Sequence, residues 1–253
     1  MSISVQTAAQ NNQLHVVRSL VTESPKLINA IDADERTALH WAASSGAKDI
    51  VRFLIDKDAQ IDVVDNMGWS PLHIAVSAGH DEVVQELVGA GADVNKFSVI
   101  SPISSTTRVF NVCFRKNGKG ITPLHYAASK SRIDIGKLLI SRGADINAKD
   151  NANQVPLHRA ATTGSAAFIN LLLNSSVPPA KTRLNNADRI GNTPLHLAMD
   201  SAHAEAAVIL INAGADRTRT NLDGEMPEDV PGVGDPEQRR VKAYVVEACG
   251  PRE

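Results

Sequence analysis

The chain has 253 residues, with 26 lysines and arginines against 28 aspartates and glutamates, so its formal net charge at pH 7 is −2. A near-neutral balance provides no general attraction to nucleic acid or to an anionic membrane, and we expect neither as a partner. The two cysteines, Cys113 and Cys249, are far apart in sequence and show no metal-ligand spacing, so we expect no metal, no cofactor and no disulfide framework.

The pattern of apolar residues predicts no targeting or membrane-spanning segment. The N-terminal residues MSISVQTAAQNNQLHVV contain no basic segment followed by an apolar run, which a secretory signal needs. No stretch approaches the roughly 18 apolar residues of a transmembrane helix. We therefore expect a protein of the cytoplasm and the nucleus.

Residues 3–31 are the first predicted element, a pair of short helices. Ala8 and Ala9 suit a helix that lies close to a neighbour, and Leu14 and Val17 follow at helical spacing. This element keeps the two-helix pattern of the repeats that follow but lacks their motif. We therefore expect it to be the N-terminal cap of an array.

A tetrapeptide then recurs through residues 32–220. It reads TALH at 37–40, SPLH at 70–73, TPLH at 122–125, VPLH at 155–158 and TPLH at 193–196. The first and third spacings between these motifs are equal, and the second and fourth are wider. A period of about 33 residues with this tetrapeptide is the ankyrin-repeat signature, so we predict five internal repeats.

The repeat at residues 65–95 shows why this sequence forms two helices. Ser70 can cap the first helix with its hydroxyl, and Pro71 suits the first helical position because its missing N–H would be unpaired there. Gly79 ends that helix, and Asp81 begins a second one with charge that favours a helix N-terminus. One such unit cannot bury its own apolar face, so the units must stack.

The second spacing exceeds the repeat period by about 19 residues, which implies an insertion near 96–114. One hypothesis is an extended finger that touches a partner. The alternatives are a disordered loop or residues from an unspliced intron. Phe97, Phe110 and Phe114 would be poorly buried in this segment, which disfavours a well-packed loop.

The last part of the chain predicts a longer loop and then a C-terminal cap. The fourth spacing exceeds the period by about five residues around Val177, to which we assign no role. Residues 221–250 fit the cap, because Met226 lies one repeat period after Thr193 and apolar residues suggest a last helix: Val241, Tyr244, Val245 and Val246. The fold class is therefore all-α, an ankyrin-repeat solenoid of seven repeats with short hairpin fingers, as one domain over residues 1–253.

Three patterns look like chemical sites but have simpler interpretations. The tetrapeptide histidines each belong to a different repeat, which favours bonds to backbone over metal or acid–base chemistry: His40, His73, His125, His158 and His196. The segment 117–122 lacks the spacing of a phosphate-binding loop. Arg115, Lys116 and Lys119 form a basic cluster that fits a solvated turn, with contact to an acidic partner as the alternative. No catalytic constellation is present, so we expect no enzyme.

The residues around the tetrapeptide resemble those of the gankyrin family. The matching runs are ALHWA at 38–42, GWSPLHIA at 68–75, PLHYAASK at 123–130, LHRAA at 157–161 and GNTPLHLA at 191–198, in the same order and over nearly the whole chain. The resemblance implies an assembly chaperone of the proteasome regulatory particle. Its implied partner is the C-terminal domain of one proteasomal ATPase subunit.

The resemblance also implies partner-binding residues at hairpin tips and on first helices. The matching positions are Asp34, Arg36, Trp41, Trp69 and Lys130; an acidic finger residue of the family falls on Asn66 here. Some family members have an LxCxE motif for pocket proteins, but residues 197–201 lack its cysteine and glutamate.

The residues themselves support an interface of this kind. The position after each tetrapeptide histidine includes Trp41, Tyr126 and Arg159, the residue types that dominate binding hot spots, and these should align on a concave face. Arg36 could hold a carboxylate through two parallel hydrogen bonds. Packing between repeats and an ordinary solvated face are the alternatives. The competing functions are a different ankyrin scaffold, such as an inhibitor of a kinase or a transcription regulator, and a subunit of an enzyme. We expect a monomer.

Overall fold

The computed structural model describes residues 3–98, 119–175, 181–232 and 234–252, and within these it is entirely helical, with no strand. The first half contains α1 (Val5–Gln10), α2 (Leu14–Glu23), the 3-10 helix η1 (Pro25–Asn29), α3 (Ala38–Ser45), α4 (Lys48–Asp56), α5 (Pro71–Ala78) and α6 (Asp81–Gly89). The second half contains α7 (Pro123–Ser129), α8 (Ile133–Ser141), α9 (Pro156–Thr162), α10 (Ala166–Leu173), α11 (Pro194–Asp200), α12 (Ala204–Asn212) and α13 (Asp235–Cys249). The predicted all-α class is confirmed.

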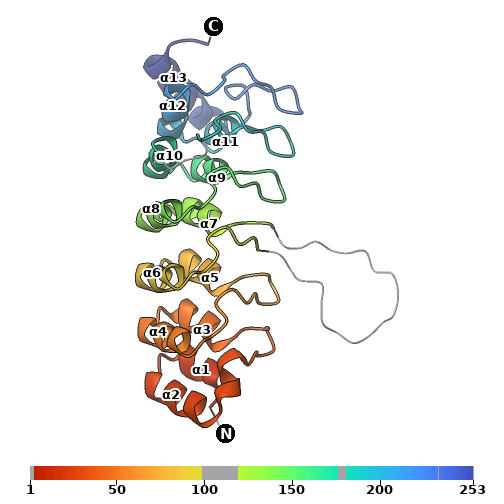
Figure 1. Cartoon of the computed structure of the whole chain (residues 1–253). Helices are drawn as coiled ribbons and strands as arrows, with labels where there is room; N and C mark the ends of the chain where they lie inside the picture. Colours follow the sequence, from red (N-terminus) through yellow and green to blue (C-terminus); the bar gives the residue numbers. More distant parts are fainter. Residues whose placement is uncertain (1–2, 99–118, 176–180, 233, 253) are drawn as a thin grey trace, which may run out of the picture. The chain divides into compact units, whose positions relative to one another are not determined.

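The helices form pairs that stack within two compact units, Met1–Pro123 and Leu124–Glu253. In the first unit, α3 packs between α1 and α5, and α4 packs between α2 and α6. In the second unit, α9 packs against α11, while α10 lies between α8 and α12. Hairpin fingers project from the first-helix side of each unit (Figure 1). The organisation as one domain over residues 1–253 stays a prediction.

The tetrapeptide builds the start of each first helix. In α5, Pro71 occupies the first turn, and the Ser70 hydroxyl oxygen lies 2.8 Å from Nδ1 of His73. The same hydroxyl–imidazole pair occurs between Thr193 and His196, also at 2.8 Å. The α9 helix differs, because Val155 stands where the other repeats have a hydroxyl. Gly79 then ends α5 in the left-handed region, with φ of 81°, which a glycine adopts without steric cost.

The core combines small residues on the first helices with large residues on the second. Ala42, Ala75 and Ala127 are fully buried and allow neighbouring helices to approach closely. Large aliphatic and aromatic side chains of the second helices fill the space between repeats, namely Leu54, Leu87, Leu139 and Phe168, all at 0% exposure. This division explains why no single repeat is stable by itself.

The ends of the chain and the insertions agree with the sequence in part. The predicted last helix is present as α13, with Val241 and Val245 buried. Tyr244 and Val246 lie in the same helix but are exposed at 49% and 42%. Residues 99–118 and 176–180 lie outside the described residues, and with them most of the predicted insertion near 96–114 and Val177. Among the described helices, none is long and apolar enough to cross a bilayer.

Candidate protein-binding surface

The buried histidines of the tetrapeptide connect each repeat to the next finger. Nε2 of His40 lies 3.1 Å from the Trp69 carbonyl oxygen on the next finger. The other four tetrapeptide histidines make the same bond to a carbonyl of the following finger: His73 to Ile121, His125 to Gln154, His158 to Asn192 and His196 to Glu225. Backbone amides donate to Nδ1 of His40, His73, His158 and His196. An amide can only donate and a carbonyl can only accept, so the proton of these four rings is on Nε2. The structural interpretation of the histidines is confirmed.

Burial keeps these imidazoles neutral. Desolvation lowers the pKa of His73 and of His125 to about 4, although a hydrogen bond to a carbonyl opposes the shift in each case. The pKa values of His40, His158 and His196 are lowered by the same cause. The histidines are therefore structural parts of the fingers, and they do not act as acids or bases near neutral pH.

An aspartate or asparagine at the base of each finger closes its turn. One side-chain oxygen of Asp65 accepts from the amides of Met67 and Trp69, both at 2.9 Å. The same double acceptance occurs at every equivalent position outside the interrupted finger: Asp32, Asp150, Asp188 and Asn221. This side chain satisfies two amides that a tight turn leaves unpaired, and so it fixes the length of the finger.

In the first unit, the second oxygen of these aspartates positions two residues of the expected interface. Oδ2 of Asp32 accepts from the Trp41 indole at 2.6 Å, and Oδ2 of the fully buried Asp65 accepts from Nε of Arg36 at 2.9 Å. The Arg36 guanidinium also lies over the Trp41 ring, 5.0 Å from its centroid. Burial raises the pKa of Asp32, but hydrogen bonds from the Trp41 indole and two backbone amides outweigh it and hold the pKa below its ordinary value. We call Asp32, Arg36, Trp41 and Asp65 the finger cluster.

The second unit repeats this arrangement with other residue types. Arg159, which has the position of Trp41, donates from its terminal nitrogen to Asp150 at 2.6 Å. Gln154, which has the position of Arg36, donates to Asp188 at 3.1 Å. An arginine–aspartate pair in one unit thus corresponds to a neutral glutamine–aspartate pair in the other. The Arg36 and Gln154 positions thus both donate a hydrogen bond to the aspartate of the next finger. Of the two donors, only Arg36 is charged.

The structure brings some of the expected interface residues together and leaves others apart. Arg36 and Trp41 are in contact and half-buried, and Trp69 is half-buried on the next finger. Asp34 is exposed, and its carbonyl accepts from the Asn66 amide at 3.0 Å. The residues of the second unit are half-buried or exposed: Tyr126, Lys130 and Arg159. That residues of both units share one concave face stays a prediction, as does the partner-binding role of each residue.

The structure shows that the Nε atom of Arg36 is not available to a partner. It is already bonded to Asp65, and 26% of the Arg36 side chain is exposed. A partner carboxylate can therefore meet only the two terminal nitrogens of the guanidinium. Sequence analysis overlooked the finger aspartates that cause this. Their signal was present, because Asp32, Asp65 and Ser98 follow one another at the same spacing as the first two tetrapeptides.

The interrupted finger keeps its base. Ser98 has the position of Asp65, and its amide donates to the Ile121 carbonyl at 3.0 Å. The Ser98 hydroxyl accepts from the Ile121 amide at 3.2 Å, as Asp65 accepts from Trp69. Residues 96–98 thus hold ordinary repeat positions, and the extra residues enter after Ser98, later than the predicted start at 96.

Models of ankyrin repeats match three segments of the chain, residues 5–98, 124–173 and 190–222. The probable 26S proteasome regulatory subunit p28 of Saccharomyces cerevisiae is 34% identical over 170 residues, which cover 65% of this chain and 66% of that protein. An ankyrin repeat-containing protein of Schizosaccharomyces pombe is 34% identical over 133 residues, which cover 51% of this chain and 49% of that protein. The matched parts thus fall short of two thirds of either relative.

Two solved structures share the fold. The ankyrin repeat domain of human ASB11 aligns with a TM-score of 0.78 at 20% identity, over 100% of both chains. The ankyrin repeat domain of Bcl-3 aligns with a TM-score of 0.73 at 22% identity, over 96% of this chain and 98% of that chain. These structures support the fold alone. With the repeat models and the yeast subunit, they show that the chain belongs to the ankyrin-repeat family and resembles the gankyrin group within it.

Proposed function

We propose that the chain is a protein-binding assembly chaperone of the proteasome regulatory particle, without catalytic activity of its own. It holds the C-terminal domain of a proteasomal ATPase subunit against its fingers and first helices, and delays the docking of that subunit until the particle is complete. The similarity to a yeast proteasome regulatory subunit supports a proteasome partner. The protein acts as a monomer in the cytoplasm and the nucleus.

The finger cluster is the observation that supports this proposal most. Arg36 is held by a buried carboxylate on one side and by the Trp41 ring on the other, so binding requires little further loss of side-chain freedom. Its remaining guanidinium edge is partly desolvated, which strengthens a hydrogen bond to a partner carboxylate. Trp69 on the next finger adds a rigid aromatic surface. Such a cluster suits an acidic segment beside an apolar one.

Binding to an ATPase subunit can be tested without disturbing the fold. Arg36→Gln should keep a hydrogen-bond donor for Asp65, because Gln154 donates to Asp188 in the same way in the second unit. The substitution removes the positive charge and the paired terminal nitrogens of the guanidinium. Combined with Lys130→Glu, it should weaken capture of the purified ATPase subunit by the full chain by about 2 kcal/mol or more. Arg52→Gln, which removes an exposed cation from α4 outside the fingers, is the matched control and should leave capture unchanged.

The outcome also separates the competing functions. Wild-type affinity in the double variant would refute the role of Arg36 and Lys130. Capture of a kinase or a transcription regulator from cell extract, with no proteasomal ATPase, would refute the chaperone proposal and favour a different ankyrin scaffold.

A further inference from the structure

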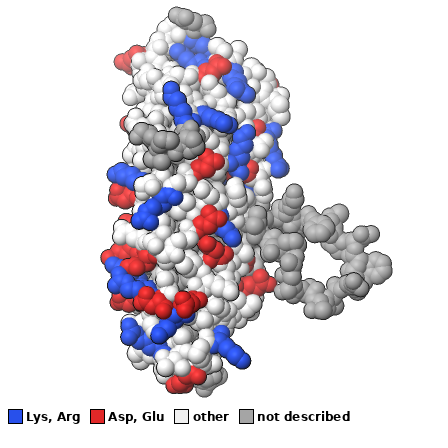
Figure 2. Space-filling view, viewed as in Figure 1, with Lys and Arg blue, Asp and Glu red and all other residues white. Residues whose placement is uncertain are grey.

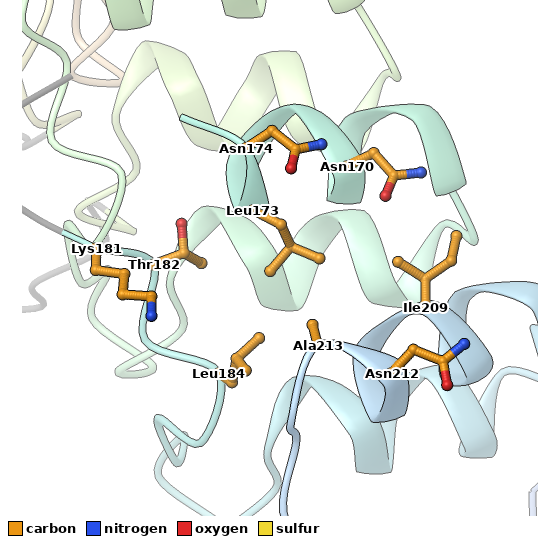
Figure 3. Close-up of a pocket in the computed structure, with 9 residues that line it drawn as sticks. All are labelled: Asn170, Leu173, Asn174, Lys181, Thr182, Leu184, Ile209, Asn212 and Ala213. Atoms are coloured by element: carbon orange, nitrogen blue, oxygen red, sulfur yellow. The ribbon is translucent and has the colours of Figure 1, made fainter. Parts of the chain in front are cut away.

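The second helices of the second unit have two adjacent hollows on their outward side. The first has a volume of about 450 Å³ and lies between α10, α12 and the loop that joins α10 to α11. Figure 3 shows Leu173, Leu184 and Ile209 around this hollow. The second has a volume of about 420 Å³ and lies between α8 and α10. Asn170 and Asn174 line both, so the two hollows adjoin at α10, and together we call them the outer groove.

At the equivalent place on the first unit, ion pairs bridge the two neighbouring second helices. Lys48 and Arg52 of α4 reach Glu82 and Glu86 of α6, with Lys48 at 3.1 Å from Glu82. Figure 2 shows basic and acidic side chains gathered over this part of the surface. Each pair joins positions 34 residues apart, one on α4 and one on α6.

Among the described residues of the second unit, no ion pair joins neighbouring helices at these repeat positions; Lys137 is charged, but it pairs within its own helix with Asp134 at 3.2 Å. Counted from the tetrapeptide histidine, Arg52 corresponds to Lys137 in α8 and to Asn170 in α10. Glu86 corresponds to Leu171 in α10 and to Ile209 in α12. The α10 helix has no charged residue, and α12 has only Glu205. The outer groove therefore lies where ion pairs between neighbouring second helices are missing among the described residues.

The groove offers amides and cations together with its apolar floor. The Asn170 and Asn174 side chains are exposed and make no hydrogen bond to another described residue. An amide side chain both donates and accepts, which matches the unpaired N–H and C=O of an extended peptide; a helical peptide satisfies these groups internally. Lys181 lines one hollow and Lys137 the other, and no acidic residue is among the described residues that line them.

We propose that the outer groove binds an extended peptide segment of another protein, with an aliphatic side chain near Leu173 and Ile209 and a carboxylate at Lys181. The amides of Asn170 and Asn174 bond the peptide backbone, and the lysines select an acidic sequence. The outer groove belongs to the second unit and the finger cluster to the first. This proposal therefore does not depend on the proposed function of the fingers.

The groove can be closed by installing the charges of the first unit. Asn170→Arg with Ile209→Glu reproduces the Arg52–Glu86 pair, and Leu171→Glu supplies a partner for Lys137. The probe is a phage-displayed library of short random peptides selected on the wild-type full chain, followed by fluorescence anisotropy with the selected sequences. We expect them to share an aliphatic residue near an Asp or Glu, and to bind the closed variant at least about tenfold more weakly.

Two controls keep the test decisive if the closed variant is unstable. Lys181→Glu changes one exposed side chain and should weaken the acidic peptides by about tenfold or more. Removal of the first unit's charges by Arg52→Ala with Glu86→Ala should leave peptide binding unchanged.

Several results would overturn the proposal. They are the absence of any selected peptide, selected peptides without an acidic residue, or equal binding to Lys181→Glu. A wild-type dimer that the closed variant cannot form would assign the groove to a second copy instead. If the peptides bind only after residues 176–180 have been replaced, the groove would be assigned to that segment of the chain itself. Capture of the ATPase subunit by the fingers should be unaffected in the closed variant.

Discussion

The buried histidines make the stability of the fold depend on pH. Because their pKa values are lowered in the folded state, the unfolded chain binds more protons at mildly acidic pH, and stability falls as pH decreases. His73 changes from a pKa of about 6.5 when unfolded to about 4 when folded. Linkage then gives a loss of about 2 kcal/mol for this one residue between pH 7 and pH 5, and His125 adds a similar amount.

The contribution of one histidine can be isolated through the slope of the free energy of unfolding against pH. At pH 5, His73 accounts for about 0.9 of a proton taken up on unfolding, or about 1.2 kcal/mol per pH unit. His73→Gln should remove this part of the slope, whatever it does to the stability at pH 7. Both tryptophans, Trp41 and Trp69, belong to the first unit, so their fluorescence during urea unfolding reports on the unit that contains His73.

Matched variants define the refuting result. His125→Gln alters the second unit, so it should change the slope seen by circular dichroism more than the slope seen by tryptophan fluorescence. A His73→Gln chain with the wild-type slope between pH 5 and pH 7 would show that the buried imidazole is already protonated when folded, which contradicts the assigned hydrogen bonds.

Three further predictions concern stability, each measured by urea or thermal unfolding. Gly136→Ala should destabilise the fold by about 1–3 kcal/mol, because the added Cβ would lie 2.7 Å from the fully buried Phe168. At Gly89 an added Cβ meets nothing, so Gly89→Ala should be neutral or stabilising, and equal effects of the two variants would refute this packing argument. Val155→Thr should stabilise by about 0.5–1.5 kcal/mol, because the hydroxyl can donate to Nδ1 of His158 as Thr193 does to His196, and a loss of stability would contradict this. Asp65→Asn should cost about 1–3 kcal/mol, because the new amide would face Nε of Arg36; addition of Arg36→Gln should restore part of it, and strictly additive effects would refute the coupling.

The sequence predicted the repeats and their helices well, because the tetrapeptide combines a cap, a proline and a histidine that act locally. It did less well where a contact with the next repeat decides the outcome. Tyr244 and Val246 follow the helical spacing of Val241 and Val245, but spacing alone does not show which side of α13 meets α12. Arg36 was predicted to be an interface residue, and this stays a prediction. Its bond to Asp65 could not be predicted, because it joins positions 29 residues apart and depends on the stacking of two fingers.

The finger aspartates also explain how one finger accepts extra residues. The aspartate caps amides two and four residues ahead, so it fits only a finger of fixed length. At the interrupted finger this length is lost, and the position is Ser98, whose shorter side chain accepts from Ile121 alone among the described residues. The backbone pairing between Ser98 and Ile121 persists nevertheless, because His73 holds the Ile121 carbonyl from the helix below at 3.1 Å. At this finger, the histidine bond from the preceding repeat therefore still fixes where the finger ends, although the aspartate-capped turn is missing.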